Sequence, residues 1–425
     1  MAKKTDIILK EVLGKVKPSK EELVEIERPL KAFVRHLEKR LKKLKIDAEI
    51  FVGGSFAKNT LIKKDKYDID IFLRFDRKHK QEISNLIEKL LEKTEGVLKV
   101  KGSRNYFQFD ATPTLFFEIV PVLKVKTPAE AENITDLSYS HVKYVNKKMK
   151  SEKMLDEIRI AKAFCYANNC YGAESYIRGF SGYGLELLVY YYGNFLKMIK
   201  TLIKSKGKVI IDIEKYHRNK SAVLMDLNKA KLQSPIVLID PTYKYRNVLA
   251  ALSEEVFEKF REECRKFLKN PSIKAFETGR INFEKEKTEA LKKKEEFILI
   301  ELSTEKQEGD IAGTKLLKFY NHLEEEINEF FEIKQKGFEY SRKQFARCFF
   351  SVKPKKEIII SGPFIDDKKN ISAFRKKHRE IFVKDGRIYT REKIEFNLKE
   401  FLENWKKKNA KKITEMYILE LEIID

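Results

Sequence analysis

A double glycine followed by two spaced aspartates is the feature that most constrains the fold of this chain. Gly-Gly-Ser occupies residues 53–55 and Asp-Ile-Asp occupies residues 68–70. The apolar residues around both motifs predict a strand, a tight turn, a short helix and a second strand, in that order. Successive side chains of a strand point to opposite faces, so Asp68 and Asp70 share one face while the isoleucines beside them enter a core.

This order of motifs indicates phosphate chemistry. Two neighbouring carboxylates repel each other unless a cation lies between them, and a divalent metal is the usual cation. Glycines let the backbone approach a phosphate closely, and the N–H groups that begin the following helix can bind the same anion. Either motif alone is more simply a polar strand face or a turn. Their combination and spacing favour a nucleotidyltransferase.

The length and composition indicate a globular protein of several domains. A chain of 425 residues can hold two to four domains. The hydrophobic share of 42% and the aromatic share of 12% exclude a disordered chain. The longest apolar stretch, 185–196, is interrupted by Gly193 and Asn194 and cannot span a bilayer. The N-terminus lacks the apolar core of a signal peptide, so we expect a cytoplasmic protein without a membrane partner.

The charge of the chain favours a polyanionic partner. Lys and Arg number 88 against 65 Asp and Glu, which gives a formal net charge of +23. With 30 Phe and 18 Tyr, nucleic acid is the partner that fits best. The alternative is a set of solvated basic faces with no partner. The cysteines have neither zinc-ligand spacing nor a disulfide context, so we expect buried or free thiols at Cys165, Cys170, Cys264 and Cys348.

The first two thirds of the chain are expected to form a mixed sheet and then a helical region. A capping box of Ser19 and Glu22 predicts a helix over 19–44. The expected strands of the sheet cover 48–52, 67–75, 97–101, 105–110 and 115–123, with a helix over 80–93. From Ser138 onward the expected helices cover 156–169, 181–204 and 254–268, with a short strand over 235–240.

Beyond about residue 270, helices and strands alternate at short intervals, which is typical of a small α+β domain. The expected elements are strands over 297–302, 337–340, 345–352 and 416–424, and helices over 313–330 and 395–409. Residues 363–378 are expected to form a basic loop and helix, and 386–389 a turn between short strands.

Glu118 is the candidate for a third metal ligand. It is the only charge in the apolar run 114–121, and an isolated ionised carboxylate inside a sheet is unfavourable unless it binds a cation. The alternative is a strand-edge glutamate that faces solvent. We expect Asp68, Asp70 and Glu118 to hold two Mg²⁺ ions, since all-oxygen ligands suit this metal. One ion would lower the pKa of an attacking RNA 3′-hydroxyl, and the other would neutralise the leaving pyrophosphate.

Three segments beyond these strands resemble the archaeal, class I CCA-adding enzymes, which are tRNA nucleotidyltransferases. The segments are 171–183, which reads Tyr-Gly-Ala-Glu-Ser-Tyr-Ile-Arg-Gly-Phe-Ser-Gly-Tyr, 185–195 and 238–248. The resemblance covers most of the chain. It is loosest in the C-terminal third, where Ile-Ser-Gly-Pro at 360–363 is the clearest match.

The resemblance implies an architecture and a set of partners. The fold would be a polymerase-β-like nucleotidyltransferase head with a mixed α/β sheet over 1–145 and a helical neck that binds nucleotide over 146–270. A ferredoxin-like α+β body with a tail, over 271–425, would bind tRNA. The family uses CTP and ATP as substrates and acts on the acceptor stem and 3′ end of tRNA. A homodimer is an open alternative to a monomer.

The resemblance also implies nucleotide contacts, residue by residue. With the turn glycine Gly54, Ser55 and Lys58 would contact the triphosphate. Ser138 and His141 fall in the head–neck segment. Lys162 and Tyr171 would contact phosphates and sugar, and Arg246 would contact the base. The chain departs from the family pattern in two places. Glu118 replaces the usual aspartate, and Lys58 stands where arginine is common, which gives a point charge instead of a bidentate fork.

Two other functions are compatible with the same motifs. A different template-independent RNA terminal transferase, such as a poly(A) or uridylyl transferase, would use the same metal chemistry. A catalytically inactive RNA-binding relative would keep the basic surface but would not need the intact pair of aspartates. Each of the four ribonucleotides, offered with a tRNA that lacks CCA, would separate these functions.

Overall fold

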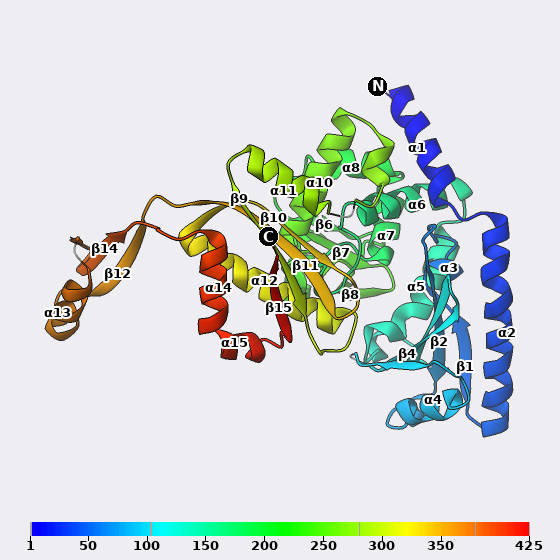
Figure 1. Cartoon of the computed structure of the whole chain (residues 1–425). Coiled ribbons are helices and arrows are strands. Elements are labelled where there is room, and N and C mark those ends of the chain that lie inside the picture. The colour runs from blue at the N-terminus through cyan, green and yellow to red at the C-terminus, as the bar shows by residue number, and fades with distance from the viewer. Residues whose placement is uncertain (1, 103, 280, 379, 425) are drawn as a thin grey trace. The chain divides into compact units, whose positions relative to one another are not determined.

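Five strands in the N-terminal part of the chain form the sheet that carries the two aspartates (Figure 1). The structure is a computed structural model that describes residues 2–102, 104–279, 281–378 and 380–424. It divides into two units, Met1–Thr278 and Gly279–Asp425. The elements up to the end of the sheet region are α1 (Ala2–Val16), α2 (Lys20–Leu44), β1 (Ala48–Val52), α3 (Gly54–Ala57), β2 (Tyr67–Phe75), α4 (Ile83–Leu91), β3 (Leu98–Val100), β4 (Tyr106–Thr112), β5 (Leu115–Leu123) and α5 (Ser138–Lys148).

The sheet has the strand order β1-β2-β5-β4-β3. Only β2 and β5 run parallel, so the sheet is mixed, as predicted. Helices α2 and α4 pack on the sheet and contribute apolar side chains to one core with β2 and β5. The capping box predicted at Ser19 is present, and α2 ends at Lys45 in the left-handed conformation. The buried residues of α2, which are Ile26, Leu30, Leu37 and Leu41, recur at intervals of four and seven residues and so lie on one face of the helix, which packs against the sheet.

A helical region follows within the same unit. Its elements are α6 (Glu152–Ala167), α7 (Gly182–Tyr192), α8 (Phe195–Leu202), β6 (Val209–Ile211), α9 (Lys220–Asp226), β7 (Ile236–Asp240), β8 (Tyr243–Asn247) and α10 (Glu254–Lys269). The prediction of one helix over 181–204 is wrong, because two helices occupy this range. Gly193 adopts a left-handed φ of 87° that ends α7, and the side chain of Asn194 caps α8 by accepting from the N–H of Lys197.

The second unit is built on a four-stranded antiparallel sheet. Its elements are α11 (Phe283–Lys292), β9 (Glu296–Ser303), α12 (Asp310–Phe330), β10 (Phe331–Tyr340), β11 (Phe345–Pro354), β12 (Ile358–Phe364), α13 (Lys368–Lys377), β13 (Ile381–Lys384), β14 (Arg387–Glu392), α14 (Leu398–Lys408), α15 (Ala410–Glu415) and β15 (Glu420–Ile424). The order β10-β11-β9-β15, with α12 and α14 as connections, is the βαββαβ arrangement of a ferredoxin-like domain, as expected. A separate three-stranded sheet, β12-β14-β13, is inserted with α13 between β11 and α14.

Two predictions for this unit need correction. Helix α11 was not expected, because its sequence is rich in charge and only Ala290 in it is buried. Strand β10 begins at Phe331, directly after α12, six residues before the predicted start. Glu332, Lys334 and Lys336 alternate with less polar residues on this edge strand, so the apolar period is weak.

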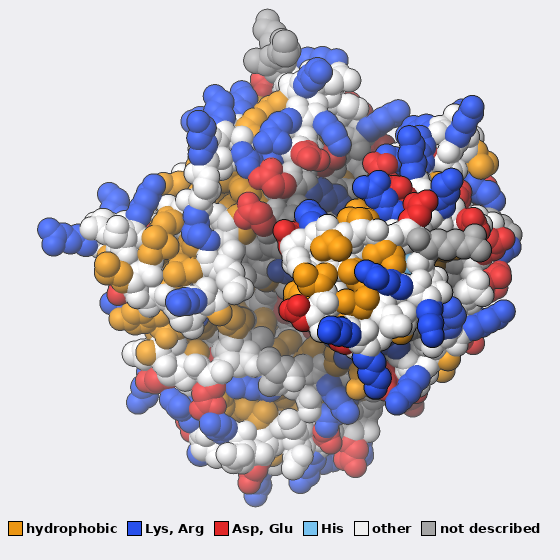
Figure 2. Space-filling view, turned by 90° about the vertical axis from the view of Figure 1, so that its left-hand side faces the viewer, with side chains coloured by type: hydrophobic (Ala, Val, Ile, Leu, Met, Phe, Trp, Pro, Cys, Tyr) orange, Lys and Arg blue, Asp and Glu red, His pale blue; other side chains and the backbone are white. Residues whose placement is uncertain are grey.

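The surface is rich in basic side chains (Figure 2) and the cysteines are unpaired, as expected from the composition. Lys and Arg side chains are spread over the face shown in Figure 2, among smaller acidic and apolar groups. All four cysteines are buried and free. Within the described ranges, no helix combines the length and the apolar character that a membrane crossing requires.

Candidate active site

Asp68, Asp70 and Glu118, here called the acidic face, lie on the pair of parallel strands at the centre of the first sheet. Strands β2 and β5 are paired so that Asp70 is opposite Glu118. The neighbours Ile69 and Ile71 are fully buried in the core, as predicted. The alternation of the strands therefore puts all three carboxylates on the face of the sheet that does not carry this core.

The carboxylates of the acidic face disfavour one another's charge. Desolvation raises the pKa of Glu118 to about 8, and the Asp70 charge adds to the rise. Desolvation also raises the pKa of Asp70 to about 6, with a further contribution from Asp68. Paired carboxylates that repel in this way are stabilised by a cation, so the chemistry of these residues fits a divalent metal.

Protein donors satisfy two of these carboxylates in the structure. The ammonium of Lys64 donates to Oδ1 of Asp68 at 2.8 Å, and the amide of Gln108 donates to Oε1 of Glu118. Among the residues that the structure describes, no three His, Cys, Asp or Glu side chains converge as a metal cage.

The glycine turn lies directly against the acidic face. Gly54 begins α3 with a left-handed φ of 62°, and a Cβ atom there would lie only 1.8 Å from Oδ2 of Asp70. The N–H of Gly53 donates to the backbone oxygen of Asp70 at 2.9 Å. The glycines are thus required for the close approach of the turn to β2. Ser55 follows in α3, half-buried.

Lys58, Thr60, Lys162 and Glu186, here called the lysine cluster, join the sheet region to the helical region. Lys58 Nζ donates to Oε2 of Glu186 and Lys162 Nζ donates to Oε1, each at 2.7 Å. The Thr60 hydroxyl also donates to Oε1, at 2.8 Å. The two carboxylate oxygens of Glu186 therefore hold one lysine from each region.

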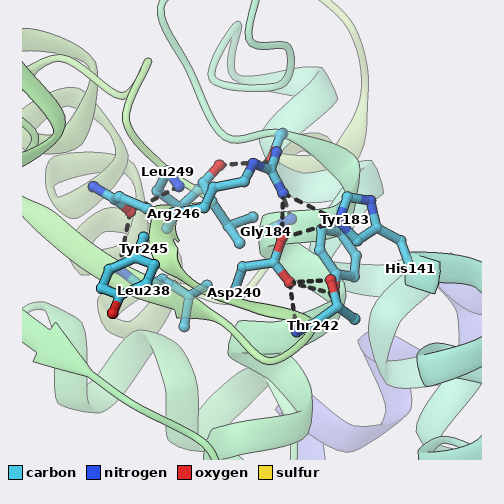
Figure 3. A network of polar contacts seen from close by, with 12 residues as sticks. His141, Tyr183, Gly184, Leu238, Asp240, Thr242, Tyr245, Arg246 and Leu249 are labelled. Carbon is cyan, nitrogen blue, oxygen red and sulfur yellow. Dashed lines mark hydrogen bonds and ion pairs between the residues drawn. The ribbon is translucent and has the colours of Figure 1, made fainter. Parts of the chain in front are cut away.

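A second buried carboxylate holds the predicted base-reading arginine. Figure 3 shows Arg246 and His141 converging on Asp240. Arg246 donates to Oδ2 of Asp240 at 2.6 Å, and the His141 Nε2 lies 2.9 Å from the same oxygen. The ring of Tyr183 stacks on His141 with 4.2 Å between centroids. Thr242 donates to the other oxygen of Asp240 through its backbone N–H and its hydroxyl, both at 2.8 Å. We call this set the arginine network.

The charges of the arginine network follow from its burial. Burial raises the pKa of Asp240, but the hydrogen bond from His141 and the charge of Arg246 outweigh it and hold the pKa well below its usual value. Burial lowers the pKa of His141 further than Asp240 raises it, so the charged form of the imidazole is disfavoured. Arg246 therefore has one ionised partner, fixed in place, and its guanidinium is oriented before any nucleotide arrives.

The remaining predicted residues lie near these groups. Ser138 begins α5, one turn before His141 on the same helix. The hydroxyl of Tyr171 lies against Gly182, where a Cβ atom would be 2.7 Å away, and the same Cβ would lie 3.9 Å from Cε of Lys162. Desolvation raises the pKa of Tyr171, and the Asp68 charge contributes to the rise.

The sequence interpretation missed Glu186 and the role of Asp240 as a partner. Glu186 carried a usable signal, because it is the only charge in the apolar run 184–196 before Lys197. That same signal led to Glu118. Asp240 could not be recognised in this way, since an Asp-Pro pair also reads as an ordinary turn.

Comparison with known proteins agrees with this geometry. Residues 156–277 match the family described as "tRNA nucleotidyltransferase, second domain". Residues 3–154 match the Second Messenger Oligonucleotide or Dinucleotide Synthetase domain. A CCA-adding enzyme of Nanoarchaeum equitans is 35% identical over 349 residues, which cover 80% of this chain and 83% of that protein. The chain belongs to the CCA-adding enzyme family. It is therefore an enzyme, a tRNA nucleotidyltransferase that uses nucleotides and a divalent metal.

Further relatives agree with family membership. The CCA-adding enzyme of Methanocaldococcus jannaschii is 29% identical over 408 residues, covering 92% of this chain and 88% of that protein. Among solved structures, a cytoplasmic RNA terminal U-transferase superposes with a TM-score of 0.50 at 14% identity. The superposition covers 66% of this chain and 100% of the other chain, and at this identity the similarity concerns the fold alone.

Proposed function

We propose that this chain adds C, C and A to the 3′ end of tRNA without a nucleic-acid template, from CTP and ATP, and releases pyrophosphate. The observation that carries the proposal is 35% identity to a CCA-adding enzyme over 83% of that protein's length. The register of Asp70 opposite Glu118 supports it, because it brings acidic residues from two strands to one face. An RNA terminal transferase of another specificity would share this face but not the sequence similarity.

We assign the metal site to the acidic face. Two Mg²⁺ ions held by Asp68, Asp70 and Glu118 would lower the pKa of the tRNA 3′-hydroxyl and neutralise the departing pyrophosphate. Glu118 stands where aspartate is usual in the family, and a shift of its strand or of the metal would absorb the extra methylene of its side chain.

The nucleotide site follows from the clusters around this face. Gly54, Ser55 and Lys58 would bind the triphosphate, with Lys162 and Tyr171 next to phosphates and sugar. Ser138, His141 and Arg246 would contact the nucleoside. Arg246 only donates hydrogen bonds, so it suits the ring-nitrogen acceptor that C and A both present on their Watson–Crick edges, where U and G present a ring N–H. An RNA phosphate or backbone carbonyl would accept from the exocyclic amino group.

The proposal also assigns a function to each part of the chain. The head would cover residues 1–145, the nucleotide-binding neck 146–270, and the body and tail 271–425. Binding of the tRNA acceptor stem would fall to the body and tail. The ferredoxin-like arrangement of the second unit and the basic residues of α13 support this assignment.

The test uses a tRNA transcript that ends before CCA, with each ribonucleotide alone and with CTP and ATP together. We expect two additions with CTP, three with CTP and ATP, and none with UTP or GTP. Activity should vanish with a chelator and return with Mg²⁺. Long tails of A or U would instead identify another RNA terminal transferase, and the absence of any product from a folded chain would identify an inactive relative.

A further inference from the structure

Glu186 is a carboxylate that the proposed chemistry does not use, although its side chain is wholly removed from solvent. It projects from α7 and meets Lys162 of α6 with one oxygen and Lys58, from the segment after α3, with the other. Thr60 donates to the oxygen that Lys162 shares. An unpaired, ionised carboxylate in a buried site would be strongly unfavourable. The two lysines and Thr60 are therefore what allow Glu186 to be buried.

The charges of the lysine cluster depend on Glu186. Burial raises the pKa of Glu186, but the ammoniums of Lys162 and Lys58 outweigh it and hold the pKa at about 2. Glu186 is therefore ionised at neutral pH and lies between two cations that would otherwise repel each other. Burial lowers the pKa of Lys162 to about 8, and the Glu186 charge opposes that fall.

The donors of the two lysines are used unequally. An ammonium has three N–H donors. Lys162 directs its donors to Glu186, to the Thr60 hydroxyl and, at the longer distance of 3.4 Å, to the Thr60 backbone oxygen. Among the described residues, Lys58 donates a hydrogen bond to Glu186 alone. Lys58 thus keeps donors for an anion, and Lys162 can release its longest contact to do the same.

Lys58 also lies near the acidic face. It caps the short helix α3 that Gly54 begins, and a Cβ atom on Gly54 would lie only 1.8 Å from Oδ2 of Asp70. Its ammonium lies 5.5 Å from the centre of the Tyr183 ring, on the side of the arginine network. Lys58, one of the two lysines that Glu186 binds, therefore lies between the acidic face and the arginine network, the two parts of the proposed nucleotide site.

We propose that Glu186 is a positioning residue that fixes the ammoniums of Lys58 and Lys162 at the spacing from which they bind the nucleotide triphosphate. This inference rests on the proposed role of the two lysines. The carboxylate acts through the lysines, so its effect falls on triphosphate binding and is equal for CTP and ATP.

The test compares Glu186→Gln, which removes the charge and keeps the shape, with Glu214→Gln. Glu214 is a matched control, because it also pairs with a lysine, Lys148, and with a tyrosine, Tyr144, in the same unit. We expect Glu186→Gln to raise KM for both CTP and ATP by about tenfold, with kcat changed by less than about threefold, since a charge-assisted contact is worth about 1.4 kcal/mol or more. Glu214→Gln should leave both constants within about twofold.

The pH profile gives a readout that a purely structural role would not move. Lys162 faces Glu186, Lys58 and Lys64, and of these only Glu186 raises its pKa. Without the Glu186 charge, Lys162 loses its proton at a lower pH. The alkaline limb of kcat/KM should therefore shift to lower pH in Glu186→Gln and stay in place in Glu214→Gln.

Two further variants separate failure of this inference from failure of the proposed function. Lys58→Met should raise KM, and Glu186→Gln added to it should multiply KM by less than about threefold, because residues that act through one another are not additive. The double variant also removes both charges of the Lys58–Glu186 ion pair, so it can be measured in place of Glu186→Gln if that single variant does not fold. If Lys58→Met raises KM but Glu186→Gln changes neither KM nor the alkaline limb, Glu186 is a structural brace and this inference is wrong. If Lys58→Met and Lys162→Met both leave KM unchanged, the proposed phosphate contacts are wrong.

Discussion

Two buried carboxylates determine how the cations around the proposed nucleotide site are held. Glu186 takes one lysine on each oxygen, and Asp240 takes Arg246 and His141 on one oxygen and Thr242 on the other. In both cases a flexible, strongly hydrated side chain becomes a fixed donor before the substrate arrives. Such preorganisation is the main contribution that a protein makes to phosphoryl transfer.

Arg246 carries the prediction on base selection. Replacement by Ala removes the donor for the ring nitrogen of C and A, so rejection of U and G should weaken by about one to two orders of magnitude, as for a lost base-edge contact. Single-nucleotide kinetics with all four triphosphates measures this. Lys244→Ala, an exposed position two residues earlier in β8, is the control. Unchanged ratios in Arg246→Ala would remove this arginine from the site.

Gly54 carries a prediction on close approach. A methyl group there would collide with Asp70 and would also strain a left-handed residue, so Gly54→Ala should lower C addition by about a hundredfold, as for an active-site group displaced by about 1 Å. Gly207→Ala isolates the collision, because Gly207 has a similar φ of 65° but a Cβ atom there would meet nothing within 4 Å. Equal losses in the two variants would mean that backbone strain, and not contact with Asp70, explains the effect.

At the scale of elements, the sequence predicts well what depends on local period and poorly what depends on distant partners. Strands β1, β2 and β5 have the predicted bounds, because each is a largely apolar run with a polar residue or a glycine at either end. Helix α11 was missed since it buries one residue only, and the break between α7 and α8 depends on a single left-handed glycine. Glu186 could have been noticed as a lone charge in an apolar run, but its pairing with Lys58 and Thr60, more than a hundred residues away, could not be predicted.

The cap of α2 carries the prediction at this scale. The Ser19 side chain accepts from the N–H of Glu22, and the Glu22 side chain accepts from the N–H of Ser19. Ser19→Ala should cost about 1 kcal/mol and lower the unfolding temperature of the first unit by about 2–4 °C. Ser221→Ala, at an exposed position inside α9, should cause no loss. A thermal scan compares the two, and equal midpoints would mean that the box does not stabilise α2.

At the scale of the whole molecule, the net charge of +23 is the property that should govern affinity for RNA. Lys and Arg side chains on the surface release counterions from the RNA when they bind its phosphates. The proposed function confines the chemistry to a small acidic face in the first unit. Affinity and catalysis are therefore expected to respond to different changes.

The salt dependence of tRNA binding tests whether affinity comes from contacts between basic side chains and RNA phosphates. If the chain contacts about six phosphates, tRNA binding should weaken about 10³-fold between about 50 and about 200 mM salt. Filter binding or fluorescence anisotropy across this range gives the slope. A nearly flat slope in a double logarithmic plot would contradict backbone recognition and leave the positive charge without a role in binding.

The most direct test of the central claim measures C addition and tRNA affinity on the same preparation of Asp70→Asn. Asp110→Asn is the matched control, because Asp110 is an exposed, ion-paired aspartate of the same sheet. We expect Asp70→Asn to lower kcat by about a hundredfold or more, as several kcal/mol of metal stabilisation are lost, while Kd for tRNA stays within about twofold of the control. A variant that keeps more than about a hundredth of the control turnover would contradict the assignment of catalysis to the acidic face.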